Sequence, residues 1–172
     1  MKYRCAVSSL NVRPLRSDET DLHRQLRLQA LKESPRAFGD ALESLERKDA
    51  DYWNALTQRV CSVDAMVVAL DGERPIGMIY GLRDLQIRQG ARLGGVWVDT
   101  HHRRRGAGSL LVHSAIGWAQ SHGFAMARLW VGPEEEAAIA LYERCGFVFT
   151  GVERPLEGRP SIVIHEMRRA LA

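Results

Sequence analysis

Three arginines and two glycines stand together just past the middle of the sequence, as RRRGAG at positions 103–108. Glycine removes the side chain that would keep a ligand away from the backbone, so free amides can point at a bound anion. Arginine adds a permanent positive charge and grips phosphate through two parallel hydrogen bonds. These residue types favour a phosphate-binding loop. A solvated basic turn, shaped by its glycines, is the alternative.

The residues on either side of this loop predict a strand before it and a helix after it. Leu93 and the run Val96–Val98 are β-branched, aromatic or apolar, and Asp99 ends the run. From Ala107 to Trp118, apolar or small residues recur at the spacing of one helical face. A helix is therefore expected to begin at or just before Gly106, where its free amides and its dipole favour negative charge.

Two other phosphate loops fit this segment poorly. A dinucleotide fingerprint needs a third glycine where Leu111 stands, and a P-loop needs Gly-Lys-Ser/Thr, which the segment lacks. The order of strand, Arg103-x-x-Gly106-x-Gly108 and amphipathic helix instead resembles the acyl-CoA pyrophosphate loop of the GNAT superfamily of N-acetyltransferases. In that family the motif is Arg/Gln-x-x-Gly-x-Gly/Ala.

A second motif follows at residues 138–147, AIALYERCGF. Pro133 and the three glutamates after it favour a helix start, and Gly146 ends the apolar helical face. The segment resembles the second GNAT signature, a short helix whose tyrosine lies beside the thioester. With two motifs in the family's order, the chain is identified as similar to GNAT enzymes from about Asn11 to Met167.

The resemblance implies that acetyl-CoA is the co-substrate and enters where strands four and five of the sheet splay apart. The backbone of strand four would pair with the pantetheine arm at Val96, Trp97 and Val98. The loop expected to hold the pyrophosphate consists of Arg103, Arg104, Arg105, Gly106, Ala107, Gly108 and Ser109.

The resemblance also assigns the catalytic acid. Tyr142 matches the tyrosine that usually protonates the departing CoA thiolate, although a tyrosine buried in the core fits the same helical face. Glu135 stands where many relatives carry an asparagine that contacts CoA.

No general base is evident in strand four. Arg92 stands where protein acetyltransferases of the family often carry a glutamate, and no carboxylate lies from Leu93 to Val98. We expect the acceptor to lose its proton to water or through its own acidity. The residues that could act as relays instead are Asp99, His101 and Glu135.

The rest of the chain predicts one mixed α/β domain over residues 1–172. Asp71-Gly72 between two apolar runs indicates a hairpin, and the strand–helix–strand crossover after residue 98 makes strands four and five parallel. The sheet is otherwise expected to be mostly antiparallel and flanked by about four helices. The predicted strands are 8–13, 65–70, 75–82, 93–98, 125–131, one from 147, and 161–167. The predicted helices are one capped by Ser17 and ending at Pro35, one from Leu42 to about Arg59, one from Gly106 to about Ser121, and one from Glu134 to Cys145.

Composition excludes several classes of protein. The formal charge is +3 and the pI is near 9.0. The three loop arginines alone account for this excess of positive charge, so we expect no nucleic-acid partner. No apolar run approaches membrane-spanning length, and the first residues do not resemble a signal peptide. These features predict a cytoplasmic protein without a membrane partner.

Metal and hydrolase chemistry are not expected either. Cys5, Cys61 and Cys145 form no CxxC pair, and the adjacent His101 and His102 point apart in an extended segment, so we predict no metal site. The sequence contains no Gly-x-Ser-x-Gly elbow. The expected function is acetyl transfer, by direct attack, to the primary amine of a small molecule, a peptide or a protein N-terminus. The sequence leaves open the identity of that amine, assembly as a homodimer, and a non-catalytic acyl-CoA sensor as the alternative.

Overall fold

The computed structural model of the chain describes residues 9–171. Its centre is a seven-stranded sheet in the order β1-β2-β3-β4-β5-β7-β6. The strands are β1 (Leu10–Pro14), β2 (Ala65–Asp71), β3 (Arg74–Arg83), β4 (Gly90–Val98), β5 (Met126–Val131), β6 (Val148–Leu156) and β7 (Arg159–Ala170). The helices are α1 (Thr20–Glu33), α2 (Leu42–Glu46), α3 (Ala50–Ser62), α4 (Ala107–Ser121) and α5 (Glu136–Arg144), with a 3₁₀ turn at Thr100–His102.

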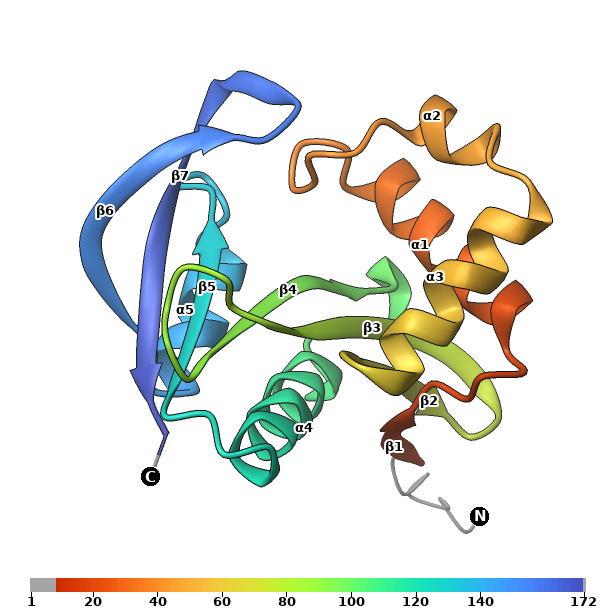
Figure 1. Cartoon of the computed structure of the whole chain (residues 1–172), viewed down its shortest axis with the longest axis horizontal. Helices are drawn as coiled ribbons and strands as arrows, with labels where there is room; N and C mark the ends of the chain where they lie inside the picture. The colour runs from red at the N-terminus through yellow and green to blue at the C-terminus, as the bar shows by residue number, and fades with distance from the viewer. Residues whose placement is uncertain (1–8, 172) are drawn as a thin grey trace, which may run out of the picture.

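Helices cover the two faces of the sheet unequally (Figure 1). α1, α2 and α3 lie over β2–β4 on one face, where Leu26, Trp53 and Trp97 belong to one buried cluster. α4 lies against the other face, where Leu111 and Leu129 belong to a second cluster. β5, β6 and β7 curve away from α1–α3, so the face of these strands opposite α4 carries no helix (Figure 1). The predicted α/β fold with a mixed sheet is confirmed.

β4 and β5 pair in parallel over only three residues. Gly90, Ala91 and Arg92 lie opposite Met126, Ala127 and Arg128, and the pairing stops there. β4 then bulges between Gly94 and Trp97, where Gly95 has a φ of +65° and an added Cβ would lie 2.6 Å from the Tyr80 ring. The predicted parallel and splayed pair is therefore confirmed, and Arg92 and Arg128 mark the point at which the strands separate. We call this place the divergence point.

The predicted hairpin and the two ends of the central helix are also confirmed. Gly72, with a φ of +62°, lies in the turn that connects β2 to β3. α4 begins after Gly106 and ends at Ser121. Gly123 follows with a positive φ of +73°, and the amides of Gly123 and Phe124 donate to carbonyls of the last helical turn.

One long second helix, predicted from Leu42 to about Arg59, is wrong. The helix stops at Glu46 and a new one starts at Ala50, so five helices replace the predicted four. Asp49 explains the break, because its backbone is extended and its side chain accepts a hydrogen bond from the Tyr52 amide at 2.9 Å. Such a cap starts a helix and cannot continue one.

The predicted cap at Ser17 is wrong as well. α1 begins after Glu19, and its first turn receives no side-chain capping bond. The Glu19 carboxylate is engaged elsewhere, because Arg13 donates two hydrogen bonds to it at 2.7 Å and the Arg16 amide donates a third. Of the first predicted strand, Ser8 lies outside the described residues, as does Cys5. Within residues 9–171, no helix combines the length and apolar character needed to cross a bilayer.

Candidate active site

The loop after β4 is shaped by the buried carboxylate of Asp99. Its Oδ1 accepts hydrogen bonds from the His101 amide at 2.8 Å and from His102 Nδ1 at 3.2 Å. Burial by itself would raise the pKa of Asp99, but these two hydrogen bonds and the charges of His102 and Arg74 bring it below its usual value. Asp99 is therefore held inside its own turn as an anion.

The start of α4 is open toward solvent. Gly106 has a φ of +93°, and a Cβ added there would meet nothing within 4 Å. The amides of the first helical turn lack acceptors within the helix, so they can donate hydrogen bonds to an anion that approaches Gly106. No neighbouring atom therefore blocks the approach to the backbone at Gly106.

The three arginines of the loop differ in their surroundings. Arg103 Nε donates to the Val98 carbonyl at 2.9 Å, and Arg105 Nη1 donates to Asp71 Oδ2 at 2.9 Å. Arg104 is exposed, with a φ of +60°, and has no hydrogen bond or ion pair among the described residues. Two of the arginines thus brace the loop, and the third is free to bind a ligand.

Gly108 has a packing role that the sequence did not reveal. A Cβ there would lie 3.1 Å from Leu141 Cδ2 and 3.9 Å from Val98 Cγ2. The missing side chain therefore lets the first turn of α4 approach α5 and the end of β4. Ala107 is buried in the same core, and Ser109 Oγ lies 3.4 Å from His113 Nδ1 on the following turn.

The side chains of the predicted pantetheine-binding segment are part of the fold. Trp97 is 3% exposed and its Nε1 donates to Glu33 Oε2 at 3.2 Å, whereas Val96 and Val98 pack toward the α4 core. β3 pairs with one edge of β4, opposite Trp97 and Val98. On the other edge of β4, the pairing with β5 ends at Arg92. The backbone groups of Val96–Val98 on that edge are therefore available to bind a ligand.

Tyr142 is 7% exposed and lies in the core below α4, with its ring edge-on to Phe147. Its hydroxyl has no hydrogen-bond partner among the described residues. Burial raises the pKa of Tyr142, and the negative charge of Glu135 raises it further. Tyr142 therefore carries its proton at neutral pH, as a proton donor must. Glu135 is exposed at the start of α5 without a side-chain capping bond.

A chain of buried polar groups next to the β4 bulge was not predicted from the sequence. His23 Nδ1 lies 2.9 Å from Thr57 Oγ1, and His23 Nε2 lies 2.7 Å from the Tyr80 hydroxyl. Burial, with a contribution from the Arg27 charge, lowers the pKa of His23 to about 4, so the ring is neutral. The available signal was His23 on the apolar face of a helix, which by itself is typical of a core residue.

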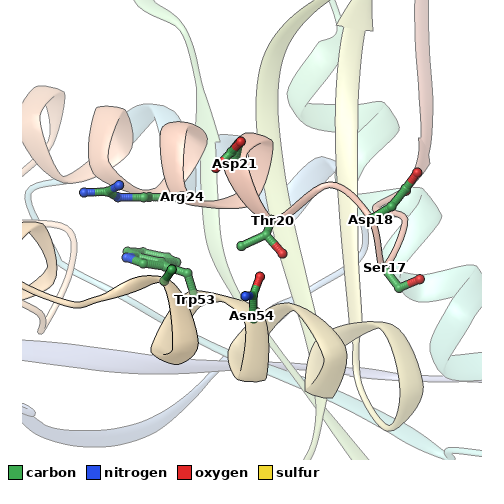
Figure 2. A pocket seen from close by; sticks show the side chains of 8 residues that line it. Ser17, Asp18, Thr20, Asp21, Arg24, Trp53 and Asn54 are labelled. Atoms are coloured by element: carbon green, nitrogen blue, oxygen red, sulfur yellow. The ribbon is translucent and has the colours of Figure 1, made fainter.

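A pocket of about 380 Å³ lies away from this region, between α1 and α3 (Figure 2). Thr20 and Arg24 from α1 and Trp53 and Asn54 from α3 line it, and the strands pass behind both helices in this view. The pocket is thus separated from the loop 103–109. Among residues 9–171, no group of three or more His, Cys, Asp or Glu side chains is placed to hold a metal ion.

Comparisons with known proteins identify the family of this chain. The model of the acetyltransferase (GNAT) family matches residues 27–147. An uncharacterised N-acetyltransferase of Methanocaldococcus jannaschii is 32% identical over 88 residues, and the match spans 49% of this chain but only 39% of that relative.

Solved structures share the fold along nearly the whole chain. A putative acetyltransferase of Salmonella typhimurium, solved with its cofactor acetyl-CoA, has a TM-score of 0.76 at 18% identity and covers 96% of this chain and 95% of its own. The spermidine N-acetyltransferase of Vibrio cholerae, in complex with CoA and spermine, has a TM-score of 0.72 at 18% identity and covers 95% and 96%. Because the family model spans β4, the loop, α4 and Tyr142, the chain belongs to the GNAT acetyltransferase family.

Proposed function

We propose that this protein transfers an acetyl group from acetyl-CoA to a primary amine by direct attack of the amine on the thioester. One observation carries the proposal. β4 separates from β5 after Arg92, and its freed edge leads directly into a loop whose helix amides and Arg104 are open to an anion. This order, a strand edge followed by an anion-binding loop, matches a pantetheine arm that ends in a pyrophosphate.

In this proposal the loop 103–109 binds the pyrophosphate and the backbone of Val96–Val98 pairs with the pantetheine. The amine nitrogen attacks the thioester carbonyl, a C–N bond forms, and the C–S bond then breaks. Tyr142 gives its proton to the departing thiolate, and the amine loses one proton to solvent. The acetyl-CoA complex of the Salmonella relative and the amine substrate named for the Vibrio enzyme support this chemistry. We place the activity in one catalytic domain working in the cytoplasm.

The amine is proposed to be deprotonated without a dedicated protein base. Asp99 is closed within its own turn, His101 is exposed, and Arg92 occupies the divergence point. An alkylamine with a pKa near about 10.4 is almost entirely protonated at pH 7. The value of kcat/KM should therefore keep rising with pH until the amine itself titrates. A plateau near neutrality that disappears on replacing Asp99, His101 or Glu135 would identify a base and contradict this part.

Release of the CoA thiol from acetyl-CoA, measured over a panel of amines, tests the proposed activity. We expect release that depends on at least one amine and is lost in Tyr142→Phe. Tight binding of acetyl-CoA with no release for any amine would favour the acyl-CoA sensor instead.

A further inference from the structure

The helix-free face of β5–β7 carries charged side chains next to the divergence point. On β5, Ala127 and Leu129 point into the α4 core, so Arg128 and Trp130 point to the opposite face. The strand pairing places Arg92 beside Arg128 and Glu166 beside Trp130. On β6, Arg154 pairs with Ile164, which shares the face of Glu166.

The carboxylates of this face are already neutralised. Arg128 Nε lies 2.6 Å from Asp84 Oδ2, and Arg128 Nη2 donates to Asp84 Oδ1 at 2.8 Å. Glu166 lies 3.2 Å from Arg128 Nη1 and 2.8 Å from Arg168 Nε. Asp84 and Glu166 therefore form their ion pairs with Arg128 and Arg168, and neither is paired with Arg92 or Arg154.

Arg92 and Arg154 are those other arginines. Neither forms an ion pair with any described carboxylate, and both are half-buried. The Arg154 guanidinium is held by stacking, 4.2 Å from the centre of the Trp130 ring, and its Nε has no hydrogen-bond partner within the described chain. Burial lowers the pKa of Arg154 and the nearby charges of Arg128 and Arg92 lower it further, while the charges of Glu157 and Asp84 partly oppose the shift. The two unpaired guanidinium groups thus lie close enough to repel each other.

A hollow lies at the turn between β6 and β7. It has a volume of about 540 Å³ and is lined by Arg36 of the α1–α2 connection and by residues 158–162. The hollow thus lies at the tip of the β6–β7 hairpin, the hairpin that also carries Arg154.

We propose that Arg92 and Arg154 bind the carboxylate of the acceptor, so that the acceptor is an amine that also carries a carboxylate, such as an amino acid. This inference rests on the proposed acetyl transfer, because it places the acceptor beside the divergence point. A carboxylate between two guanidinium groups supplies the missing counter-charge and accepts charge-assisted hydrogen bonds from both. A polyamine, which adds only positive charge, would be repelled here.

The first test compares amino acids with their own amides: glycine, β-alanine and L-phenylalanine against glycinamide, β-alaninamide and L-phenylalaninamide. The amine of the amide is less basic, so its reactivity at neutral pH alone would favour the amide. In at least one pair, we expect kcat/KM to be about tenfold or more higher for the amino acid than for its amide. Higher kcat/KM for the amides, or for phosphoethanolamine over every amino acid, would overturn the carboxylate assignment while leaving acetyl transfer intact. No turnover with any amine would contradict both.

The second test uses Arg92→Gln and Arg154→Gln. Each should raise KM for the accepted amino acid about 10- to 100-fold, because a hydrogen bond to a charged group contributes roughly 1.5–3 kcal/mol. Neither should lower kcat/KM for the amide of that acid, because the amide has no carboxylate for the guanidinium group to bind. Arg47→Gln, at an exposed arginine between α2 and α3, is the matched control and should change neither substrate's kinetics. Unchanged acetyl-CoA affinity by calorimetry shows that the variants are folded. An equal loss of kcat/KM for the amino acid and for its amide would overturn the inference.

Discussion

Arg103 is tied to Val98: its Nε donates a 2.9 Å hydrogen bond to the carbonyl oxygen of the last residue of β4. The proposed pyrophosphate loop is thereby fastened to the strand whose backbone is proposed to bind the pantetheine. This arrangement makes Arg103 a positioning residue, whereas Arg104, which has no partner among the described residues, is left for the ligand.

Arg104→Ala should weaken acetyl-CoA binding without changing the melting temperature. Loss of one charge-assisted hydrogen bond to phosphate corresponds to a rise in Kd of about 10- to 100-fold. Calorimetry at two salt concentrations measures the effect, and the difference between wild type and variant should shrink at high salt. Arg105→Ala is the comparison, because it breaks the bond to Asp71 and should also lower stability. An Arg104→Ala protein with wild-type affinity would remove Arg104 from the site.

Gly106 and Gly108 should respond differently to alanine. Gly108→Ala places a methyl group 3.1 Å from Leu141 Cδ2, and such overpacking costs about 1–3 kcal/mol. Gly106→Ala meets no neighbour but forces a positive φ on alanine, at about 1–2 kcal/mol.

The second change Leu141→Ala separates the two cases in a double-mutant cycle followed by urea unfolding. It should relieve much of the Gly108→Ala cost and none of the Gly106→Ala cost. If the pyrophosphate also needs the space at Gly108, the rescued protein will regain stability but not acetyl-CoA affinity. Equal coupling energies for both glycines would contradict the packing role of Gly108.

Tyr142→Phe should lower kcat by about a hundred- to ten-thousandfold, the range typical of a positioned acid. The melting temperature and the acetyl-CoA Kd should stay close to wild type, because the hydroxyl has no partner among the described residues. Burial raises the pKa of Tyr142 above its usual value near 10, so ionisation of this group should not reduce the rate between pH 7 and 10. A variant with normal kcat and lower stability would make Tyr142 a core residue only.

His23 should make folding stability depend on pH. Its pKa is near 6.5 when unfolded and about 4 when folded, so below pH 6.5 the unfolded chain binds the extra proton. The contribution of the neutral, buried His23 to the free energy of unfolding is complete above pH 6.5. It is lost as the pH falls toward 4, by up to about 3 kcal/mol. Urea unfolding at pH 7.5 and 4.5 measures this loss, and His23→Gln should remove most of the difference. If the free energy of unfolding changed with pH as much in His23→Gln as in the wild type, other groups would be the cause of the pH dependence.

Features that depend on neighbouring residues could be predicted from the sequence. The hairpin at Asp71-Gly72, the helix start at Gly106 and the parallel β4–β5 crossover follow from local periodicity and turn residues, and the structure has all three. The break at Asp49 was also a local signal, since Asp is a strong helix cap, but the apolar face running through it hid the boundary.

Features that depend on distant residues could not be predicted. Arg105 pairs with Asp71, 34 positions away, so a run of three arginines gave no sign that only Arg104 is free. The contact of Gly108 with Leu141 and the stacking of Arg154 on Trp130 also appear only when separate strands and helices are assembled. On β5, the alternation of Arg128 and Trp130 with apolar residues was the available signal of a second, polar face.

The most direct test of the account follows the acetyl group itself. Acetyl-CoA labelled in the acetyl carbon is mixed with the protein and the best amine from the panel, and both CoA and product are quantified by mass spectrometry. We predict one N-acetylated amine for each CoA released, no acetylated protein when the amine is omitted, and loss of both products in Tyr142→Phe. Bound but unconsumed acetyl-CoA, or CoA released without an acetylated amine, would contradict the proposal that this chain is an amine acetyltransferase.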